Sequence, residues 1–140
     1  MSAHSTPDPL RLFELDVDVR VRYAECDPQN VVHHSVYPVW FEIARTELLR
    51  SHGVNYRQLE AQGTRFVVAR MAVRYRKPAR YDDMLRVHVR ALPGQGVKID
   101  HEYTVLRDDE LLATGTTTLV CVDAEGRVKA VPEGLQCEPS

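Results

Sequence analysis

An alternation of apolar and charged side chains runs through residues 13–23 of the 140-residue chain. The apolar members are Phe13, Leu15, Val17, Val19, Val21 and Tyr23, and acidic or basic residues fill the positions between them. A period of two is typical of a strand with one buried side and one solvent-facing side. The pattern predicts a first strand here, and it places Tyr23 on the apolar side.

The spacing of apolar residues then changes to that of a helix over residues 36–51. Ser35 is predicted to cap this helix, Pro38 falls in its first turn, where a missing N–H costs little, and Gly53 is predicted to end it. A wide apolar side predicts burial of the helix against a sheet; its members are Val36, Tyr37, Trp40, Phe41, Ile43, Ala44 and Leu48. A short second helix is predicted over residues 56–62, before Gly63.

The rest of the chain reads as strands joined by short turns. A strand is predicted over residues 65–77, with one side formed by Val67, Ala69, Met71, Val73 and Tyr75. The next has Leu85, Val87, Val89 and Ala91 on one side, and a turn over residues 93–96 leads into a returning strand over residues 97–107.

A turn at residues 108–110 precedes a long strand over residues 111–122, and a small hairpin through residues 123–126 leads to Val128. Both sides of the long strand are apolar near its end, so we expect it inside the sheet. Short connections require antiparallel pairing, because a parallel crossover needs about a dozen residues or more. The prediction is an α+β fold in one domain spanning residues 1–140, with an ordered core of about 12–132 and loose ends over residues 1–10 and 136–140.

Composition removes several classes of function. A formal net charge of -2 argues against a general nucleic-acid binder. No run of roughly 18 apolar residues is present and the first nine residues have no apolar segment, so we expect neither export nor integral membrane association. Three widely spaced cysteines fit neither a disulfide framework nor a zinc knuckle, which makes the cytoplasm the expected location.

The candidate chemistry lies between the first strand and the long helix. Asp27 occupies this junction, and a carboxylate beside backbone N–H groups at a helix start suits acyl chemistry. Hydrolysis of a thioester needs a base or nucleophile and a donor for the developing oxyanion, and it needs no metal. Asp27 is therefore the candidate for the first role, and His34 the candidate for orienting water or the leaving group.

A motif through this loop and helix resembles the hotdog-fold acyl-CoA thioesterases of the 4-hydroxybenzoyl-CoA thioesterase type. It reads Tyr23-x-Glu25-x-Asp27-x-x-x-Val31-Val32-x-His34-x-x-Tyr37 and continues as Phe41-Glu42-x-Ala44-Arg45-x-Glu47. The segments over residues 75–83 and 116–123 resemble the same family, so that the resemblance spans about residues 12–132. His34 favours the Tol-Pal-associated branch, because an aromatic residue replaces it in the hydroxybenzoyl branch.

The resemblance implies a hotdog fold, in which an antiparallel sheet wraps one long central helix, and hydrolysis of an acyl- or aroyl-CoA without a cofactor or metal. It implies that Asp27 is the catalytic carboxylate, acting as nucleophile or general base, and that Tyr23 and His34 assist it. Asn30 stands where glycine is common, and Asn tolerates a positive φ better than most residues. The family also implies a homodimer or homotetramer whose sheets join edge to edge, with each site built from two chains.

Each assignment has a simpler alternative. Asp27 before Pro28 is also typical of a turn in which the carboxylate bonds to nearby backbone N–H groups. Tyr23 is also expected in the core, and Cys26 is expected to be a small packing residue rather than a nucleophile. A metal site at His33 and His34 with Glu25 and Asp27 is less favoured, because adjacent histidines lack the i, i+4 spacing of a helical ligand pair.

The substrate is less well defined. Phosphates of coenzyme A have candidate partners in a basic cluster, which comprises Arg74, Arg76, Lys77, Arg80, Arg86 and Arg90. An aryl or medium-length acyl pocket, or ordinary core, accounts equally for Tyr37, Trp40, Phe41 and Met71. Two other functions remain open: a hotdog hydratase or dehydratase acting on the acyl chain, and a noncatalytic acyl-CoA-binding module.

Overall fold

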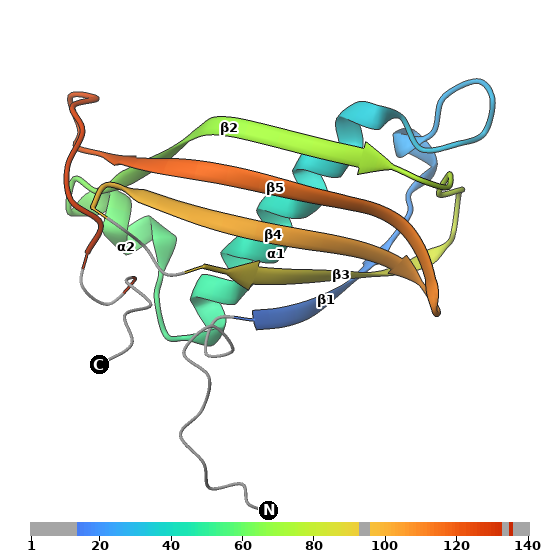
Figure 1. The fold of residues 1–140 in the computed structure, drawn as a ribbon, viewed down its shortest axis with the longest axis horizontal. Coiled ribbons are helices and arrows are strands. Elements are labelled where there is room, and N and C mark those ends of the chain that lie inside the picture. Colours follow the sequence, from blue (N-terminus) through green and yellow to red (C-terminus); the bar gives the residue numbers. More distant parts are fainter. Residues whose placement is uncertain (1–13, 93–95, 133–134, 136–140) are drawn as a thin grey trace, which may run out of the picture.

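One antiparallel sheet with a long helix across one of its faces forms the architecture in this computed structural model, which describes residues 14–92, 96–132 and 135 (Figure 1). The strand order is β1-β3-β4-β5-β2. The strands are β1 (Glu14–Arg20), β2 (Arg65–Tyr75), β3 (Met84–Ala91), β4 (Lys98–Arg107) and β5 (Glu110–Val122). The helices are α1 (Tyr37–Ser51) and α2 (Tyr56–Ala61), with short 3-10 helices η2 (Tyr23–Glu25) and η3 (His34–Val36). The predicted α+β class and antiparallel pairing are confirmed.

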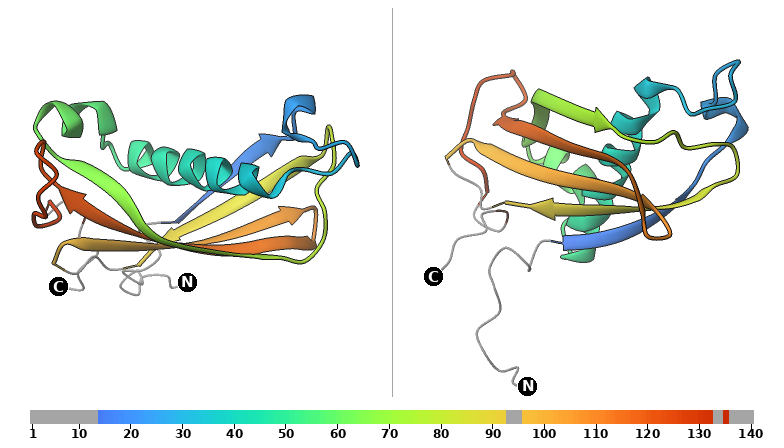
Figure 2. Two further views of the ribbon diagram at one scale, coloured as in Figure 1. Left: turned by 90° about the horizontal axis from the view of Figure 1, so that it is seen from above. Right: turned by 45° about the vertical axis from the view of Figure 1, so that its right-hand side comes forward.

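The helices lie on one face of the sheet, and the sheet curves around α1 (Figure 2). Alternation explains this layering, because Leu85, Val87 and Val89 of β3 are fully buried while Arg86 between them is exposed. No helix among the described residues is long and apolar enough to span a bilayer. The predicted loose ends and most of the predicted turn at 93–96 lie outside the described residues, as does Phe13.

The first strand ends earlier than its alternation predicts. β1 stops at Arg20, and the chain turns into η2, where the Glu25 N–H donates to the Arg22 carbonyl over 3.0 Å. Tyr23 is therefore not on the apolar side of a strand, and its side chain is 77% exposed. The prediction of a core position for Tyr23 is wrong, because the local turn overrides the period of two.

The boundaries of α1 agree with the sequence except at its cap. Pro38 lies in the first turn, and Gly53 follows the helix with φ +78°, a conformation that glycine adopts without strain. Val36 occupies the N-cap position and no side chain caps the helix, so the predicted capping role of Ser35 is wrong. The Ser35 hydroxyl instead lies 2.7 Å from His33 Nδ1.

The core centres on the first half of α1. Trp40, Phe41 and Ala44 are fully buried, and the Phe41 ring stacks on the Tyr103 ring of β4 with centroids 4.2 Å apart. Gly115 of β5 lies against this ring, since a Cβ there would come within 2.5 Å of Phe41. The glycine therefore lets β5 approach the helix closely. Tyr37, Trp40 and Phe41 are ordinary core, whereas Met71 is 45% exposed.

A bulge in β2 changes which side chains share a face. The pairing with β5 shifts between Val68 and Arg70, so that Val68 pairs with Leu119 and Met71 with Thr117. Partners in an antiparallel pair lie on the same face, and Leu119 and Thr117 are both buried against the helix side. The predicted single face holding Val67, Ala69 and Met71 is therefore wrong, because one extra residue reverses the alternation.

The long strand β5 is paired on both sides, by β4 and β2, as its apolar character predicts. Its hairpin is also confirmed, with a bridge from Val122 to Val128. The two edges of the sheet are β1 and β2, and they differ in character. β1 alternates charged residues along its solvent side, whereas β2 has four apolar side chains that are 45–48% exposed: Val67, Val68, Met71 and Tyr75.

Candidate active site

The loop containing Asp27 is a small, closed turn before α1. Its ends are joined by a bridge between Cys26 and Val32, and inside them the Asp27 N–H donates to the Val31 carbonyl over 2.9 Å. The Asn30 N–H closes the tip on the Asp27 carbonyl at 2.9 Å. Asn30 has φ +66°, a conformation that asparagine tolerates better than most residues.

The side chain of Asp27 is half-buried and held by its own loop. Its Oδ1 accepts from the backbone N–H of Gln29 at 2.9 Å and of Val31 at 3.3 Å. The expectation of amides from the start of the helix is wrong, because both donors precede η3. Within the described residues Oδ2 has no hydrogen bond, so one oxygen is fixed and the other is free.

Glu25 anchors this loop to α1, a structural role that the sequence analysis did not predict. It is 7% exposed. Its Oε1 accepts from the Arg22 N–H at 2.7 Å, and its Oε2 accepts from Trp40 Nε1 at 3.2 Å and from the Arg22 guanidinium at 3.2 Å. Two features of the sequence could have indicated this role. Arg22 and Glu25 have the spacing of a capping box, and a buried tryptophan requires a hydrogen-bond acceptor.

Removing this anchor has a testable cost. Glu25→Ala leaves Trp40 Nε1 buried without an acceptor, so we expect the free energy of unfolding to fall by about 1–3 kcal/mol. Glu25→Gln keeps a side-chain oxygen and is the matched control, with a smaller loss. Urea unfolding followed by fluorescence of Trp40, the only tryptophan, measures both. Equal stability of the two variants would show that the Trp40 hydrogen bond contributes nothing.

His34 and Tyr23 flank Asp27 in the chain, but among the described residues no ring contact or hydrogen bond of their side chains involves Asp27. The His34 ring lies 4.1 Å from the His33 ring, and the His34 carbonyl accepts from the Tyr75 hydroxyl at 3.0 Å. Tyr23 packs edge-on against Tyr81 at 5.6 Å. No hydrogen bond or ring contact joins Tyr23, Asp27 and His34 to one another in residues 14–92. The structure therefore gathers the three candidates around one loop without connecting them.

The match to known proteins covers this loop, α1 and the whole sheet beyond β1. The model of the thioesterase-like superfamily matches residues 21–137. The chain belongs to that superfamily. The predicted family and hotdog fold are thereby confirmed, and the family's arrangement of one long helix on an antiparallel sheet is the one described above.

Curated relatives and a solved structure agree with this assignment. The chain is 34% identical to the acyl-CoA thioester hydrolase YbgC of Escherichia coli O6:H1, covering 86% of this chain and 91% of the relative. It is 38% identical to the acyl-CoA thioesterase YbgC of Haemophilus influenzae, covering 81% and 83%. A crystal structure of a probable thioesterase from Bartonella henselae superposes with a TM-score of 0.81 at 31% identity, covering 85% of this chain and 99% of that one.

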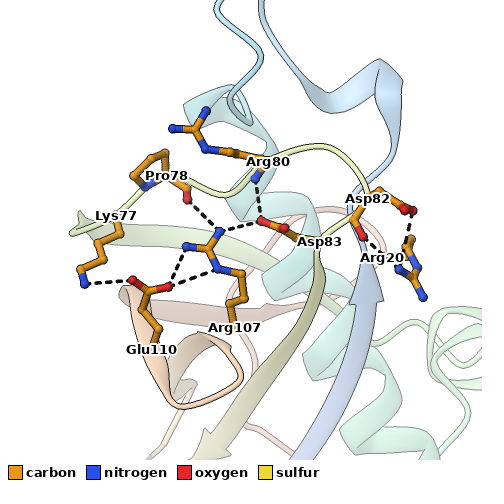
Figure 3. Close-up of polar contacts among 8 residues, drawn as sticks. All are labelled: Arg20, Lys77, Pro78, Arg80, Asp82, Asp83, Arg107 and Glu110. Carbon is orange, nitrogen blue, oxygen red and sulfur yellow. Dashed lines mark hydrogen bonds and ion pairs between the residues drawn. The ribbon is translucent and has the colours of Figure 1, made fainter.

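A cluster of ion pairs between side chains holds the segment after β2 in place (Figure 3). Arg107 donates to Asp83 at 2.7 Å, to Glu110 at 2.7 Å and to the Pro78 carbonyl at 3.3 Å. Lys77 donates to the other Glu110 oxygen at 2.9 Å. These charge-assisted bonds raise the pKa of Arg107, with Glu110 as the largest cause, and they fix the segment beside the Asp27 loop.

Three basic residues of the sequence prediction differ in their surroundings. Lys77 is paired with Glu110, and Arg90 is paired with Glu102 across the sheet. Arg80 differs, because only its backbone N–H joins the cluster, donating to Asp83 at 2.9 Å, while its guanidinium is directed away from it (Figure 3). Arg80 also forms a bridge with Val31, the residue whose N–H contacts Asp27. The backbone of Arg80 therefore lies beside the candidate site, and its guanidinium lies outside the ion-pair cluster.

A cavity of about 260 Å³ lies elsewhere, along the second half of α1, and none of Tyr23, Asp27 and His34 lines it. His101 of β4 is part of its wall. Burial lowers the pKa of His101 from 6.5 to about 4, and the charge of Arg45 contributes in the same direction.

This shift predicts a pH dependence of stability. Between about pH 6.5 and 4, His101 binds a proton in the unfolded protein but not in the folded one. The free energy of unfolding is therefore unaffected by this residue above about pH 6.5 and falls as the pH drops toward 4. At about 1.4 kcal/mol per tenfold change, the loss amounts to about 3 kcal/mol. Urea unfolding of wild type and His101→Phe at pH 7.5 and pH 4.5 isolates the effect, since the phenylalanine does not titrate. An equal acid-induced loss in both proteins would contradict it.

Proposed function

We propose that this member of the thioesterase-like superfamily hydrolyses an acyl- or aroyl-CoA thioester to the free acid and coenzyme A, with Asp27 as the central catalytic residue. One observation supports this role: two backbone amides hold the Asp27 carboxylate through Oδ1, while Oδ2 has no hydrogen bond in the part of the chain that the structure describes. The names of the Escherichia coli and Haemophilus influenzae relatives support the substrate class.

The geometry supports two routes for Asp27. In the first, Oδ2 attacks the thioester carbonyl carbon, the C–S bond breaks with release of the coenzyme A thiolate, and water hydrolyses the mixed anhydride. In the second, Oδ2 takes a proton from water as the water attacks, and the leaving thiolate is then protonated. In both routes the bonds to Oδ1 hold the carboxylate in place before the reaction, so that Oδ2 loses less conformational freedom on reaching the transition state. His34 is proposed to orient water or the leaving group, and Tyr23 to assist.

A second copy of the chain is proposed to complete the site, as a homodimer or homotetramer. Edge strands expose unpaired backbone groups and are usually protected by charge. β1 has that protection, whereas β2 exposes Val67, Val68, Met71 and Tyr75. The hydroxyl of Tyr75 bonds to the His34 carbonyl, which connects the apolar edge directly to the candidate site. Pairing of two β2 edges would therefore bring the partner chain against the loop of Asp27, and sedimentation measures whether the chain dimerises.

Arg80 is proposed to bind a phosphate of coenzyme A. Arg80→Ala is expected to raise KM for an acyl-CoA about 10- to 150-fold with little change in kcat, since a hydrogen bond to a charged group contributes about 1.5–3 kcal/mol. The same acyl group on N-acetylcysteamine, which has no phosphate, should show no such change. Arg86→Ala, on the outer face of the sheet, is the matched control. A KM increase for both thioesters would contradict a phosphate contact.

The function itself is tested with a panel of short, long, branched and aromatic acyl-CoA esters. Release of free thiol, followed with an Ellman-type reagent, is the expected result, and the relative kcat/KM values define the acyl group. An altered acyl absorbance without thiol release would indicate a hydratase or dehydratase. Saturable binding with neither signal would indicate a noncatalytic acyl-CoA-binding module.

A further inference from the structure

The carbonyl of His34 is followed four residues later by a proline, and this leaves it without the donor that an α-helix supplies. η3 leads directly into α1, and in an α-helix the carbonyl of residue 34 accepts from the N–H of residue 38. Pro38 has no N–H. The Tyr75 hydroxyl donates to this carbonyl over 3.0 Å, although the two residues are 41 positions apart in the chain. A side chain of the sheet therefore supplies a hydrogen bond at the start of the helix.

The other hydrogen bonds around His34 are local to its own loop. The His33 N–H donates to the Glu25 carbonyl at 2.9 Å. His33 Nδ1 accepts from the Ser35 N–H at 3.2 Å and lies 2.7 Å from the Ser35 hydroxyl. These bonds shape the loop but do not attach it to the sheet at residue 34. The hydroxyl of Tyr75 is the contact that makes this attachment.

The core of the protein fixes Tyr75 in turn. Tyr75 is the last residue of β2 and pairs with Ala113 of β5, which is fully buried. Its ring packs edge-on against Tyr37 with centroids 5.0 Å apart, and Tyr37 is 2% exposed and lies 4.9 Å from the Trp40 ring. Burial raises the pKa of the Tyr75 hydroxyl above its ordinary value of about 10, so the hydroxyl keeps its proton and donates. Figure 1 shows the end of β2 beside the start of α1.

The side chain of His34 depends on this backbone contact for its orientation. It is exposed, and its ring lies against the ring of His33 with centroids 4.1 Å apart. Among the residues that the structure describes, its ring nitrogens form no hydrogen bond. The direction of the ring is therefore set by the backbone at residue 34. A displacement of about 1 Å in a group that orients reactants can lower a rate about 10²-fold.

We propose that Tyr75 is a positioning residue for thioester hydrolysis, whose hydroxyl fixes the backbone of His34 so that the imidazole keeps the orientation that the reaction requires. This inference rests on the proposed function, in which His34 orients water or the leaving group. Tyr75 acts through His34 and makes no contact with the reacting atoms.

The first test measures the position of His34 without an assay of activity. Tyr75→Phe removes the hydroxyl and keeps the ring that packs on Tyr37. We expect the His34 ring resonance, followed by NMR and assigned by its loss in His34→Ala, to shift and to show greater mobility. Thr118→Val is the matched control, because it removes a hydroxyl that donates to Asp100 at 2.5 Å on the outer face of the sheet. An unchanged His34 resonance in Tyr75→Phe would overturn the proposal, and Thr118→Val should leave it unchanged.

The second test separates rate from affinity. For an acyl-CoA that the protein hydrolyses, Tyr75→Phe is expected to lower kcat about 5-fold, the effect of one neutral hydrogen bond, with KM nearly unchanged. In a His34→Ala background the same change should cost no further kcat, because the side chain that Tyr75 positions is absent. An equal loss in both backgrounds would show that Tyr75 does not act through His34, and would overturn the proposal.

Failure of this proposal is distinguishable from failure of the proposed function. If the wild type releases no thiol from any ester of the acyl-CoA panel, hydrolysis is refuted, and NMR of Tyr75→Phe still decides whether the hydroxyl holds His34. If the wild type is active but Tyr75→Phe retains its kcat, hydrolysis stands and Tyr75 has no positioning role. If His34→Ala is too slow to assay, the NMR shift together with the kcat loss in Tyr75→Phe decides the matter.

Discussion

Asp27→Asn is expected to lower kcat for acyl-CoA hydrolysis by about 10²–10⁴-fold, the usual contribution of a general base or nucleophile. Asparagine keeps an oxygen in the position of Oδ1, so the bonds from Gln29 and Val31 and the shape of the loop should persist. What it removes is the carboxylate oxygen that is free to react. We therefore expect a large loss in kcat with little change in KM or in unfolding free energy, measured by thiol release and urea denaturation.

Asp82→Asn is the matched control for that loss. Asp82 is a loop aspartate too, although more exposed than Asp27; it has φ +69°, and its carboxylate is paired with Arg20 at 3.6 Å. Asparagine tolerates this backbone conformation, so kcat should stay within a few-fold of wild type. If Asp27→Asn also retained full kcat, the carboxylate of Asp27 would serve the turn alone, as Asp before Pro often does.

A single turnover in ¹⁸O-labelled water tests the nucleophilic route for Asp27. If the carboxylate attacks the thioester and water then attacks the aspartyl carbon of the anhydride, the label enters Asp27 and the free acid takes an unlabelled oxygen from the enzyme. If Asp27 activates water, or if water attacks the acyl carbon of an anhydride, the first turnover places the label only in the free acid, so label in Asp27 identifies the nucleophilic route. Mass spectrometry of the product and of the Asp27 peptide reads both outcomes.

Phe41→Ala is expected to lower the free energy of unfolding by about 3–5 kcal/mol, the range for removing a fully buried aromatic ring. The ring is 0% exposed and stacks on Tyr103, and Gly115 lies against its edge. Collapse of the surroundings into the space is limited, because glycine has no side chain to extend. Urea unfolding followed by circular dichroism measures the change.

Ile43→Ala tests whether that loss reflects position rather than helix composition. Ile43 is on the same helix but 40% exposed, so its loss should be well below that of Phe41→Ala, since surface substitutions usually change stability by no more than about 0.5 kcal/mol. Similar losses in the two variants would contradict the view that the Phe41 and Tyr103 stack is the centre of the core.

The elements with a clean period were predictable, and those shaped by local hydrogen bonds were less so. The span of α1 and the alternation of β3 follow from apolar spacing, because each element buries one side and its apolar residues therefore repeat with the period of a helix or a strand. The end of β1 at Arg20 was not predicted, since the buried Glu25 carboxylate bonds to the Arg22 N–H and turns the chain. The bulge beside Ala69 was not predicted either. It depends on the pairing of β2 with β5, and the residues of β2 alone do not show where that pairing shifts.

The amino-acid sequence by itself determined the class of fold, the family and the loop in which to look for chemistry, because these depend on periodicity and on residues close together in the chain. Only the tertiary structure decided which atoms hold Asp27, that Trp40 bonds to Glu25, that Arg80 lies beside the loop, and that His101 lines a cavity. The physical reason is that each of these depends on contacts between segments distant in the chain or on the orientation of a single side chain, and periodicity carries no information about either.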